Sequence, residues 1–354
     1  MCVPQAIQEV SDQSSGPSDI TPDTETINLA IIVLNYCTPD LVINCLETVL
    51  PEIESTSAKI VIVDNASTDD SVDRISDWLN ENDVNNQCLF IVSDVNGGFS
   101  AGNNLGIRAI SARFYLLLNS DTLVRQGAFK ILLKAAEENI DAGLFSPRLE
   151  WPDGAPQISC FRFISPVHEL LRIGSLRLLE KMLPRHVVGM PVSNKVIFPQ
   201  WTSFACVLIR REVFESVGLL DEGYFMYFDD ADFCQRCRKA GWKIRHEPAS
   251  RVIHLRGGSS SVKRQSRKRK RVPEYYYRSR SRYFRIHYHG RAGLFLANVL
   301  WYAGWMVGRL KQLFGKQPPP VCEQEWRDIW KGFYTKQVSS IPVFEDDVDA
   351  QRLS

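Results

Sequence analysis

The chain lacks an excess of charge of either sign, because its 42 lysines and arginines are balanced by 41 aspartates and glutamates. With a net charge of +1, no chain-wide field points to nucleic acid or to acidic partners. The chain also lacks a second Cys-x-x-Cys beside Cys234-Gln235-Arg236-Cys237, which leaves a structural zinc site short of ligands. We therefore interpret the nine scattered cysteines as reduced thiols in a cytosolic compartment.

The first 26 residues have neither the basic start nor the long apolar core of a signal peptide. Their content of Ser, Asp, Thr and Pro predicts a disordered N-terminal tail instead. The whole chain has 354 residues, 44% of them hydrophobic, which is enough for one large domain with appendages or for two domains. No internal repeat is visible.

From residue 27 onward, short apolar runs alternate with helical patterns. The runs predict strands at 29–34, 59–63, 88–93 and 114–118. A first helix is expected at 39–50 with Thr38 as its N-cap, and a second one ends near residue 80, with Ser67 or Thr68 as its N-cap. A third helix is expected after a Gly-rich turn at 96–104, and a fourth at 127–139. Because parallel strands need crossover helices, this order predicts an α/β fold with a mostly parallel central sheet covered on both faces.

Polar side chains end three of these strands. Asn35 ends the first, Asp64 ends the second, and Asn119-Ser120-Asp121 ends the run at 114–118. Open α/β sheets bind ligands at the carboxyl edge of their strands. The sequence therefore predicts a ligand site at this edge.

A second acidic centre follows the aromatic run at 224–228, where Asp229 and Asp230 open a predicted helix. A carboxylate placed at a helix start, near aromatic rings and a second acid, is suited to act as a general base. The alternative is that both acids only cap the helix and interact with its dipole.

Six segments, in this order and spacing, resemble the family 2 glycosyltransferases of the GT-A fold, and particularly their rhamnosyltransferase-like branch. They are IIVLNY (31–36), VDNASTD (63–69), NGGFSAGNN (96–104), NSD (119–121), YFDDADF (227–233) and HLRGGS (254–259). Members of this family are inverting enzymes that use a nucleotide-sugar donor and a divalent metal. The resemblance therefore implies a Rossmann-like nucleotide-sugar-binding domain and Mg or Mn as cofactor.

The resemblance also implies roles for individual residues at the nucleotide. Asn35 and Asp64 would hold the nucleotide, and Gly98 and Asn103 would let the backbone approach it. Asn119 stands where the family's Asp-x-Asp motif has its first acid, and would bind the donor sugar or ribose. Helix capping by Asp64, and turn chemistry at the other positions, are the alternatives.

The remaining implied roles concern the metal, the sugar and the acceptor. Asp121 and His254 would bind the metal, although a lone histidine can also be structural. Asp230 would be the catalytic base and Asp229 its helper, with the reverse assignment left open. Trp201 would line the donor sugar pocket or fill the core.

These roles predict transfer of a sugar, L-rhamnose from dTDP-L-rhamnose, to a hydroxyl of a cell-surface polysaccharide or a lipid-linked glycan precursor. A UDP-hexose donor and a catalytically inactive glycan- or lipid-binding module are the alternatives. A nucleotidyltransferase would need a Gly-rich basic loop after the first strand, and the segment after Asn35-Tyr36 has none.

The domain prediction is a tail at 1–26, a GT-A domain at 27–260 with a nucleotide-binding half (27–125) and an acceptor half (126–260), a C-terminal helical appendage at 261–316, and a tail at 317–354. Between Lys263 and Arg291 lie twelve Lys or Arg and one Glu, and a Trp/Tyr-rich apolar run occupies 292–308. We expect this appendage to bind an anionic membrane surface, and the protein to be peripheral on the inner face of the cell membrane. A loop closing over the donor pyrophosphate, nucleic-acid binding and a solvated loop are alternatives for the basic stretch, with nucleic acid the least favoured.

Overall fold

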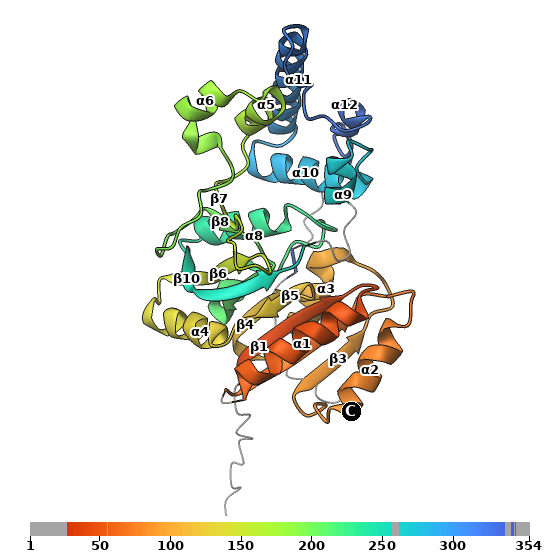
Figure 1. Ribbon diagram of the computed structural model, residues 1–354, viewed down its shortest axis with the longest axis vertical. Helices are drawn as coiled ribbons and strands as arrows, with labels where there is room; N and C mark the ends of the chain where they lie inside the picture. Colours follow the sequence, from red (N-terminus) through yellow and green to blue (C-terminus); the bar gives the residue numbers. More distant parts are fainter. Residues whose placement is uncertain (1–26, 55, 257–261, 337–340, 343, 345–354) are drawn as a thin grey trace, which may run out of the picture.

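The computed structural model describes residues 27–54, 56–256, 262–336, 341–342 and 344. The tail expected at 1–26 and the end of the motif at 254–259 lie outside the described residues. An eight-stranded sheet forms the body of the described chain, and a group of helices stands at one end of it (Figure 1).

Four parallel strands form the half of the sheet that the sequence predicts, in the order β3-β2-β1-β4. Their apolar runs are continuous because both faces of these strands are buried, as at Ile31 and Ile32 in β1. The strands are β1 (Ile27–Asn35), β2 (Ala58–Asp64), β3 (Cys88–Val92) and β4 (Ala112–Asn119), connected by the helices α1 (Pro39–Ile53), α2 (Ser71–Glu81) and α3 (Gly98–Arg108).

The other four strands extend the sheet in the order β9-β6-β10-β5. β9 is antiparallel to both β4 and β6, whereas β10 runs parallel to β6 and antiparallel to β5. The pairing of β10 with β5 sets His254 opposite Thr122, beside the turn that follows β4. The bounds are β5 (Thr122–Val124), β6 (Ala142–Glu150), β9 (Cys206–Arg210) and β10 (Lys243–His254).

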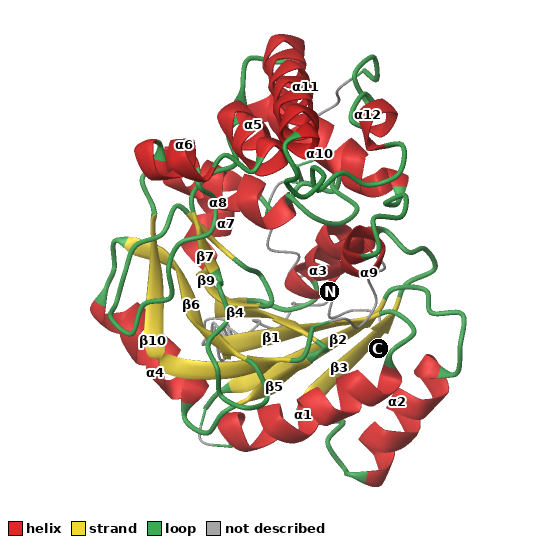
Figure 2. Cartoon of the chain, turned by 45° about the horizontal axis from the view of Figure 1, so that its top comes forward, coloured by secondary structure: helices red, strands yellow, loops and turns green. Residues whose placement is uncertain are grey.

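Helices cover both faces of the sheet, as predicted. Figure 2 shows α1 and α2 on one side of it and α3 on the other. Side chains of α1, α2 and α4 (Ala128–Glu138) pack against Ile31 and Val33, whereas those of α3, α7 (Arg211–Val217) and α8 (Asp229–Lys239) pack against Ala30 and Ile32. The prediction of an α/β fold with a mostly parallel sheet is confirmed.

A buried ionic cluster organises the group of helices. Glu169 lies 3.3 Å from the Arg280 guanidinium and 3.0 Å from that of Arg172, and Arg172 also reaches Glu325 at 3.2 Å. Arg280 donates a 2.9 Å hydrogen bond to Asn298. The cluster joins four helices: α5 (Pro166–Gly174), α10 (Glu274–His287), α11 (Arg291–Leu313) and α12 (Glu325–Asp328).

The group of helices thus includes α5, which lies in the predicted acceptor half and not in the predicted appendage. α11 packs on α5 closely, because a Cβ on Gly304 would lie 2.8 Å from the carbonyl oxygen of Leu170. Among the described residues, no helix combines the length and the apolarity that a membrane crossing requires. The predicted C-terminal tail also contributes to the fold, since Phe344 stacks on Phe214 at 5.9 Å.

Two local predictions are wrong. Most of the Gly-rich turn at 96–104 is helix, because α3 already begins at Gly98. Thr38 does occupy the N-cap position of α1, directly before Pro39, although its hydroxyl donates to Asn35 Oδ1 at 3.2 Å and not to a helix amide. Neither Ser67 nor Thr68 caps α2, which begins later, at Ser71, and the Ser67 hydroxyl accepts a hydrogen bond from the Cys37 amide instead.

Candidate active site

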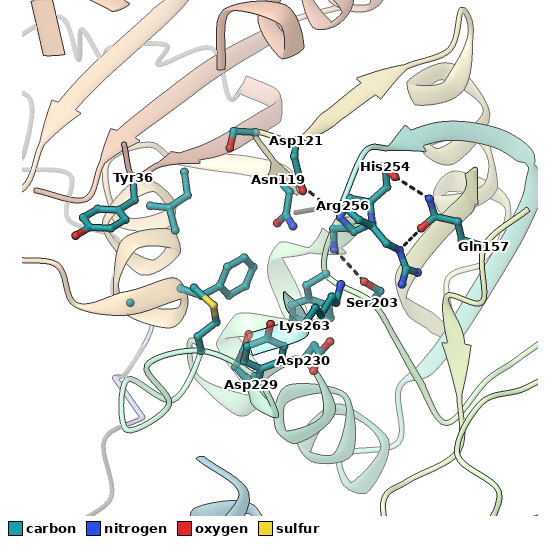
Figure 3. Close-up of a pocket in the computed structure, with 18 of the residues that line it drawn as sticks. Tyr36, Asn119, Asp121, Gln157, Ser203, Asp229, Asp230, His254, Arg256 and Lys263 are labelled. Carbon is teal, nitrogen blue, oxygen red and sulfur yellow. Dashed lines mark hydrogen bonds and ion pairs between the residues drawn. The ribbon is translucent and has the colours of Figure 1, made fainter. Parts of the chain in front are cut away.

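A cavity of about 1060 Å³ opens at the carboxyl ends of β1, β2 and β4. Its walls come from both halves of the GT-A domain and from two segments beyond β10 (Figure 3). Of the ten predicted site residues, seven line it: Gly98, Asn119, Asp121, Trp201, Asp229, Asp230 and His254. A cavity therefore lies at the sheet edge where the sequence predicts a ligand site, and the roles of these residues stay predictions.

Asp121 and His254 meet at one wall of this cavity. Asp121 Oδ1 lies 3.4 Å from His254 Nε2, and the Leu255 amide donates to the Asp121 carbonyl oxygen at 2.9 Å. The antiparallel pairing of β5 with β10 produces this contact, because it aligns the turn after β4 with the end of β10. Residues far apart in the sequence are thus fixed side by side by the sheet.

The chemistry of this pair suits a divalent cation that the substrate helps to bind. A carboxylate and an imidazole are ligands for Mn²⁺, and Mg²⁺ sites often combine one or two carboxylates with substrate phosphates. His254 Nδ1 is buried and has no hydrogen-bond partner among the described residues, so no structural hydrogen bond to this nitrogen fixes the ring. No cluster of three or more acidic, Cys or His ligands occurs in the described part of the chain.

Asn35 and Asp64 are fully buried behind the cavity, and neither is among the described residues that line it. Asn35 Nδ2 donates to Asp64 Oδ2 at 2.7 Å, and the Ser67 amide donates to Asp64 Oδ1 at 2.8 Å. They therefore fix the ends of β1 and β2. The residue after each, Tyr36 or Asn65, lines the cavity instead, and nucleotide contact by Asn35 and Asp64 stays a prediction.

Gly98 is required by its backbone conformation and by its neighbours. Its φ is +83°, and a Cβ there would lie 2.0 Å from the carbonyl oxygen of Phe225. That carbonyl accepts a 2.7 Å hydrogen bond from the Phe99 amide, so the start of α3 is joined to the segment before α8. Asn103 lies deeper in α3, outside the lining, and donates to the Phe99 carbonyl oxygen at 2.8 Å.

Asp229 and Asp230 open α8 directly after two residues in the left-handed region, Tyr227 with φ 70° and Phe228 with φ 67°. Such conformations are costly for bulky residues and cluster at functional sites. Burial raises the pKa of Asp229 to about 7. Burial, and then the charge of Asp229, raises the pKa of Asp230 well above its usual value.

The pKa of Asp232, one turn later, is shifted in the opposite direction. Burial alone would raise its pKa, but the hydrogen bond with His287 at 2.8 Å and the charge of Arg236 lower it. Its other contacts are with the Arg236 guanidinium at 2.9 Å and the Tyr224 hydroxyl at 3.3 Å. These contacts give Asp232 a structural role in the first turn of α8.

Trp201 and Asn119 also line the cavity. Trp201 stacks on Phe161 with ring centroids 4.1 Å apart and donates from Nε1 to the Arg162 carbonyl oxygen at 2.8 Å. It is largely buried yet contributes to the lining, so both of its predicted roles fit. Asn119 donates from its backbone to the Ala205 carbonyl oxygen at 2.9 Å.

Three polar residues of the lining were not among the predicted site residues: Gln157, Arg256 and Lys263. Gln157 donates to the His254 carbonyl oxygen at 2.7 Å and accepts from Arg256 Nε. Lys263 lies within electrostatic range of Arg256, Asp121 and Asp230. Arg256 belongs to the motif at 254–259 and Lys263 begins the basic stretch, so their charge was visible in the sequence, whereas the role of Gln157 had no such signal.

The residues that line the cavity lie within the part of the chain that matches a known protein family. The family model described as "Glycosyltransferase like family 2" matches residues 27–272, which include every lining residue named above. The chain belongs to this family. The prediction of a family 2 glycosyltransferase is thereby confirmed.

Relatives of this glycosyltransferase include two curated proteins. The low-salt glycan biosynthesis hexosyltransferase Agl10 of Haloferax volcanii is 27% identical over 231 residues, or 64% of this chain and 67% of its own length. An N-acetylglucosaminyl-diphospho-decaprenol L-rhamnosyltransferase of Mycobacterium tuberculosis is 32% identical over 150 residues, or 41% of this chain. The matched part is about half, 48%, of the length of that relative.

A solved structure shows the same fold. The mannosyltransferase PcManGT from Pyrobaculum calidifontis, in complex with GDP-Man and Mn²⁺, aligns with a TM-score of 0.52 at 14% identity. The alignment covers 86% of this chain and 80% of that one. The GT-A fold prediction is therefore confirmed, while the roles of individual residues rest on the geometry above.

Proposed function

We propose that this glycosyltransferase transfers a sugar, L-rhamnose from dTDP-L-rhamnose, to a hydroxyl of a cell-surface polysaccharide or a lipid-linked glycan precursor, with inversion at the anomeric carbon. One observation carries the proposal. A single cavity is lined on one side by Asp121 and His254 and on the other by Asp229 and Asp230 (Figure 3). An activated sugar bound between these pairs would have its diphosphate leaving group beside Asp121 and His254, and the attacking hydroxyl of the acceptor would lie beside Asp229 and Asp230.

The donor diphosphate is assigned to the side of Asp121, His254, Arg256 and Lys263. A divalent cation, Mn²⁺ or Mg²⁺, held by Asp121 and His254 would neutralise charge on the leaving diphosphate. The solved relative in complex with GDP-Man and Mn²⁺ supports this assignment. Arg256 and Lys263 supply two further positive charges at this side, and Gln157 orients Arg256 through its hydrogen bond.

The acceptor hydroxyl is assigned to the side of Asp230. The Asp230 carboxylate takes the hydroxyl proton while the hydroxyl oxygen forms a bond to the anomeric carbon. The bond from that carbon to the diphosphate oxygen breaks, and the nucleoside diphosphate leaves with the electron pair. Because Asp229 is next to Asp230, its charge raises the affinity of Asp230 for the proton.

The choice of L-rhamnose rests on the curated relative that is named for this transfer and is 32% identical over the matched segment. Its name also supplies the lipid-linked acceptor class. A direct test is to incubate the protein with Mn²⁺ and a panel of nucleotide sugars, and to detect released nucleotide and free sugar by mass spectrometry.

We expect hydrolysis of dTDP-L-rhamnose above that of UDP-hexoses, and we expect Asp121→Asn to abolish it. Asp77→Asn is the matched control, because it changes an exposed acid of α2. Turnover of a UDP-hexose alone would reject the donor while leaving the transferase assignment intact. No turnover of any donor by the wild type, together with nucleotide binding, would favour the inactive binding module.

A further inference from the structure

The outer face of α11 carries an unusually long apolar surface. Its inner face, with Leu294, Trp301 and Gly304, is buried against the other helices. On the outer face, five side chains are each 50% exposed or more: Phe295, Leu296, Met306, Leu310 and Leu313.

These exposed side chains form one stripe. At about 100° of rotation per residue, Leu296, Met306, Leu310 and Leu313 fall within an arc of about 100° that also includes Phe295, Val299 and Ala303. The stripe extends roughly 25 Å along the helix at about 1.5 Å per residue. We call this set of seven residues the α11 stripe.

A second exposed apolar pair lies at the same end of the molecule. The short helix α6 (Arg177–Met182) exposes Leu178 and Met182 by 79% and 74%. The end of α11 contacts the turn between α5 and α6, because Lys311 Nζ donates to the carbonyl oxygens of Gly174 and Ser175 at 3.0 and 2.9 Å. Figures 1 and 2 both show α6 and α11 at the end opposite α1 and α2.

The charge around these apolar residues is mainly positive. α11 contains Arg291, Arg309 and Lys311 and no acidic residue. By the same helical rotation, Arg291 and Arg309 lie along one border of the α11 stripe. Residues 177–186, in α6 and just after it, carry three Lys or Arg and one Glu. Apolar side chains bordered by cations match a bilayer surface with anionic headgroups.

We propose that the α11 stripe and α6 dock on the surface of an anionic lipid bilayer, with the stripe in the headgroup region. This surface differs from the one expected from the sequence. The sequence pointed to the appendage at 261–316, with its basic stretch and the apolar run at 292–308. One face of that run is packed inside the protein, and α6 was not expected to take part. The proposal does not depend on which sugar is transferred.

The test is cosedimentation of the full-length protein with vesicles. We expect binding to vesicles of phosphatidylcholine mixed with phosphatidylglycerol, weaker binding to phosphatidylcholine alone, and weakening by salt. Leu310→Gln combined with Leu313→Gln should lower the partition coefficient by about tenfold or more, since two large apolar side chains no longer enter the interface. Leu89→Gln combined with Ile140→Gln is the matched control, because these two exposed aliphatic residues lie elsewhere.

Thermal unfolding and nucleotide-sugar hydrolysis should be unchanged in the stripe variant, which separates this proposal from the proposed function. Arg309→Gln should reduce the preference for anionic vesicles and leave folding intact. The proposal is overturned if the wild type binds neither vesicle, or if the stripe variant binds as well as the control variant. Concentration-dependent self-association that the stripe variant abolishes, without vesicle binding, would assign the surface to a second copy of the chain.

Discussion

Single residues at this site have meaning only through their neighbours in space. The pKa of Asp230 is raised by burial and by the charge of the buried Asp229 beside it. The pKa of Asp232 is lowered instead, because Asp232 contacts His287 and Arg236. The sequence predicted the acids, because their types and spacing are local. The sequence could not show that the Asn35 side chain donates a hydrogen bond to Asp64, because this contact depends on the register of β1 and β2.

The acidic pair leads to a pH prediction. Because burial and the charge of Asp229 raise the pKa of Asp230, the base stays protonated to a higher pH than an ordinary carboxyl group, and kcat should rise with pH above the range in which ordinary carboxyl groups titrate. Asp229→Asn removes the like charge, so the pKa of Asp230 should fall and the rising limb of the kcat profile should move to lower pH. A limb that does not move would contradict the coupling, and loss of all turnover would instead make Asp229 the base.

Gly98 gives a stability prediction with an internal control. Gly98→Ala should lower the free energy of unfolding by about 2–4 kcal/mol, since it combines a left-handed φ with a clash at the Phe225 carbonyl. Gly127→Ala is the control, because Gly127 has a φ of +78° but open space around its Cβ position. Urea unfolding should show a clearly smaller loss for Gly127→Ala, and equal losses would contradict the role of the contact.

At the scale of elements, the parallel half of the sheet was predictable, whereas the pairing of the strands in the other half was not. The runs at 29–34, 59–63, 88–93 and 114–118 are regular enough to identify strands from local pattern alone. The antiparallel insertion of β9 between β4 and β6 is a long-range pairing that no local pattern encodes. α5 was also missed, because it lies within a proline-rich stretch that has no clear period.

The contact between Glu169 and Arg280 gives an element-scale prediction. Burial raises the pKa of Glu169, but the charges of Arg280 and Arg172 outweigh this and lower it from 4.5 to about 2. A lowered folded-state pKa stabilises the protein above pH 4.5, and this contribution is lost as the pH falls from about 4.5 to about 2.

Glu169→Gln should therefore lower the free energy of unfolding at pH 7 by about 3–5 kcal/mol, because it leaves buried guanidinium groups uncompensated. It should also make stability less sensitive to pH below 4.5. Glu81→Gln, at an exposed position that ends α2, is the control and should change little. Equal stability of the two variants in urea would show that the cluster does not hold α5 against α10.

At the scale of the whole molecule, one cavity receives residues from both halves of the GT-A domain, from α9 (Val262–Arg267) and from α10. The sequence identified Asp121, His254, Asp229 and Asp230, and folding brings them to the lining of this cavity, whereas Gln157 and the orientation of Arg256 appear only in three dimensions. α6 and α11, which carry the exposed apolar residues, lie at the end of the molecule opposite α1 and α2 (Figure 1). Chemistry and the proposed membrane contact thus occupy separate surfaces.

The most direct test of the central claim is the steady-state turnover of the preferred nucleotide sugar by Asp230→Asn, measured beside Asp77→Asn. The expected result is a fall in kcat of about 10²–10⁴-fold for Asp230→Asn, with thermal stabilisation by the nucleotide unchanged. Near-native kcat in Asp230→Asn would contradict the claim that this cavity positions Asp230 as the base for sugar transfer.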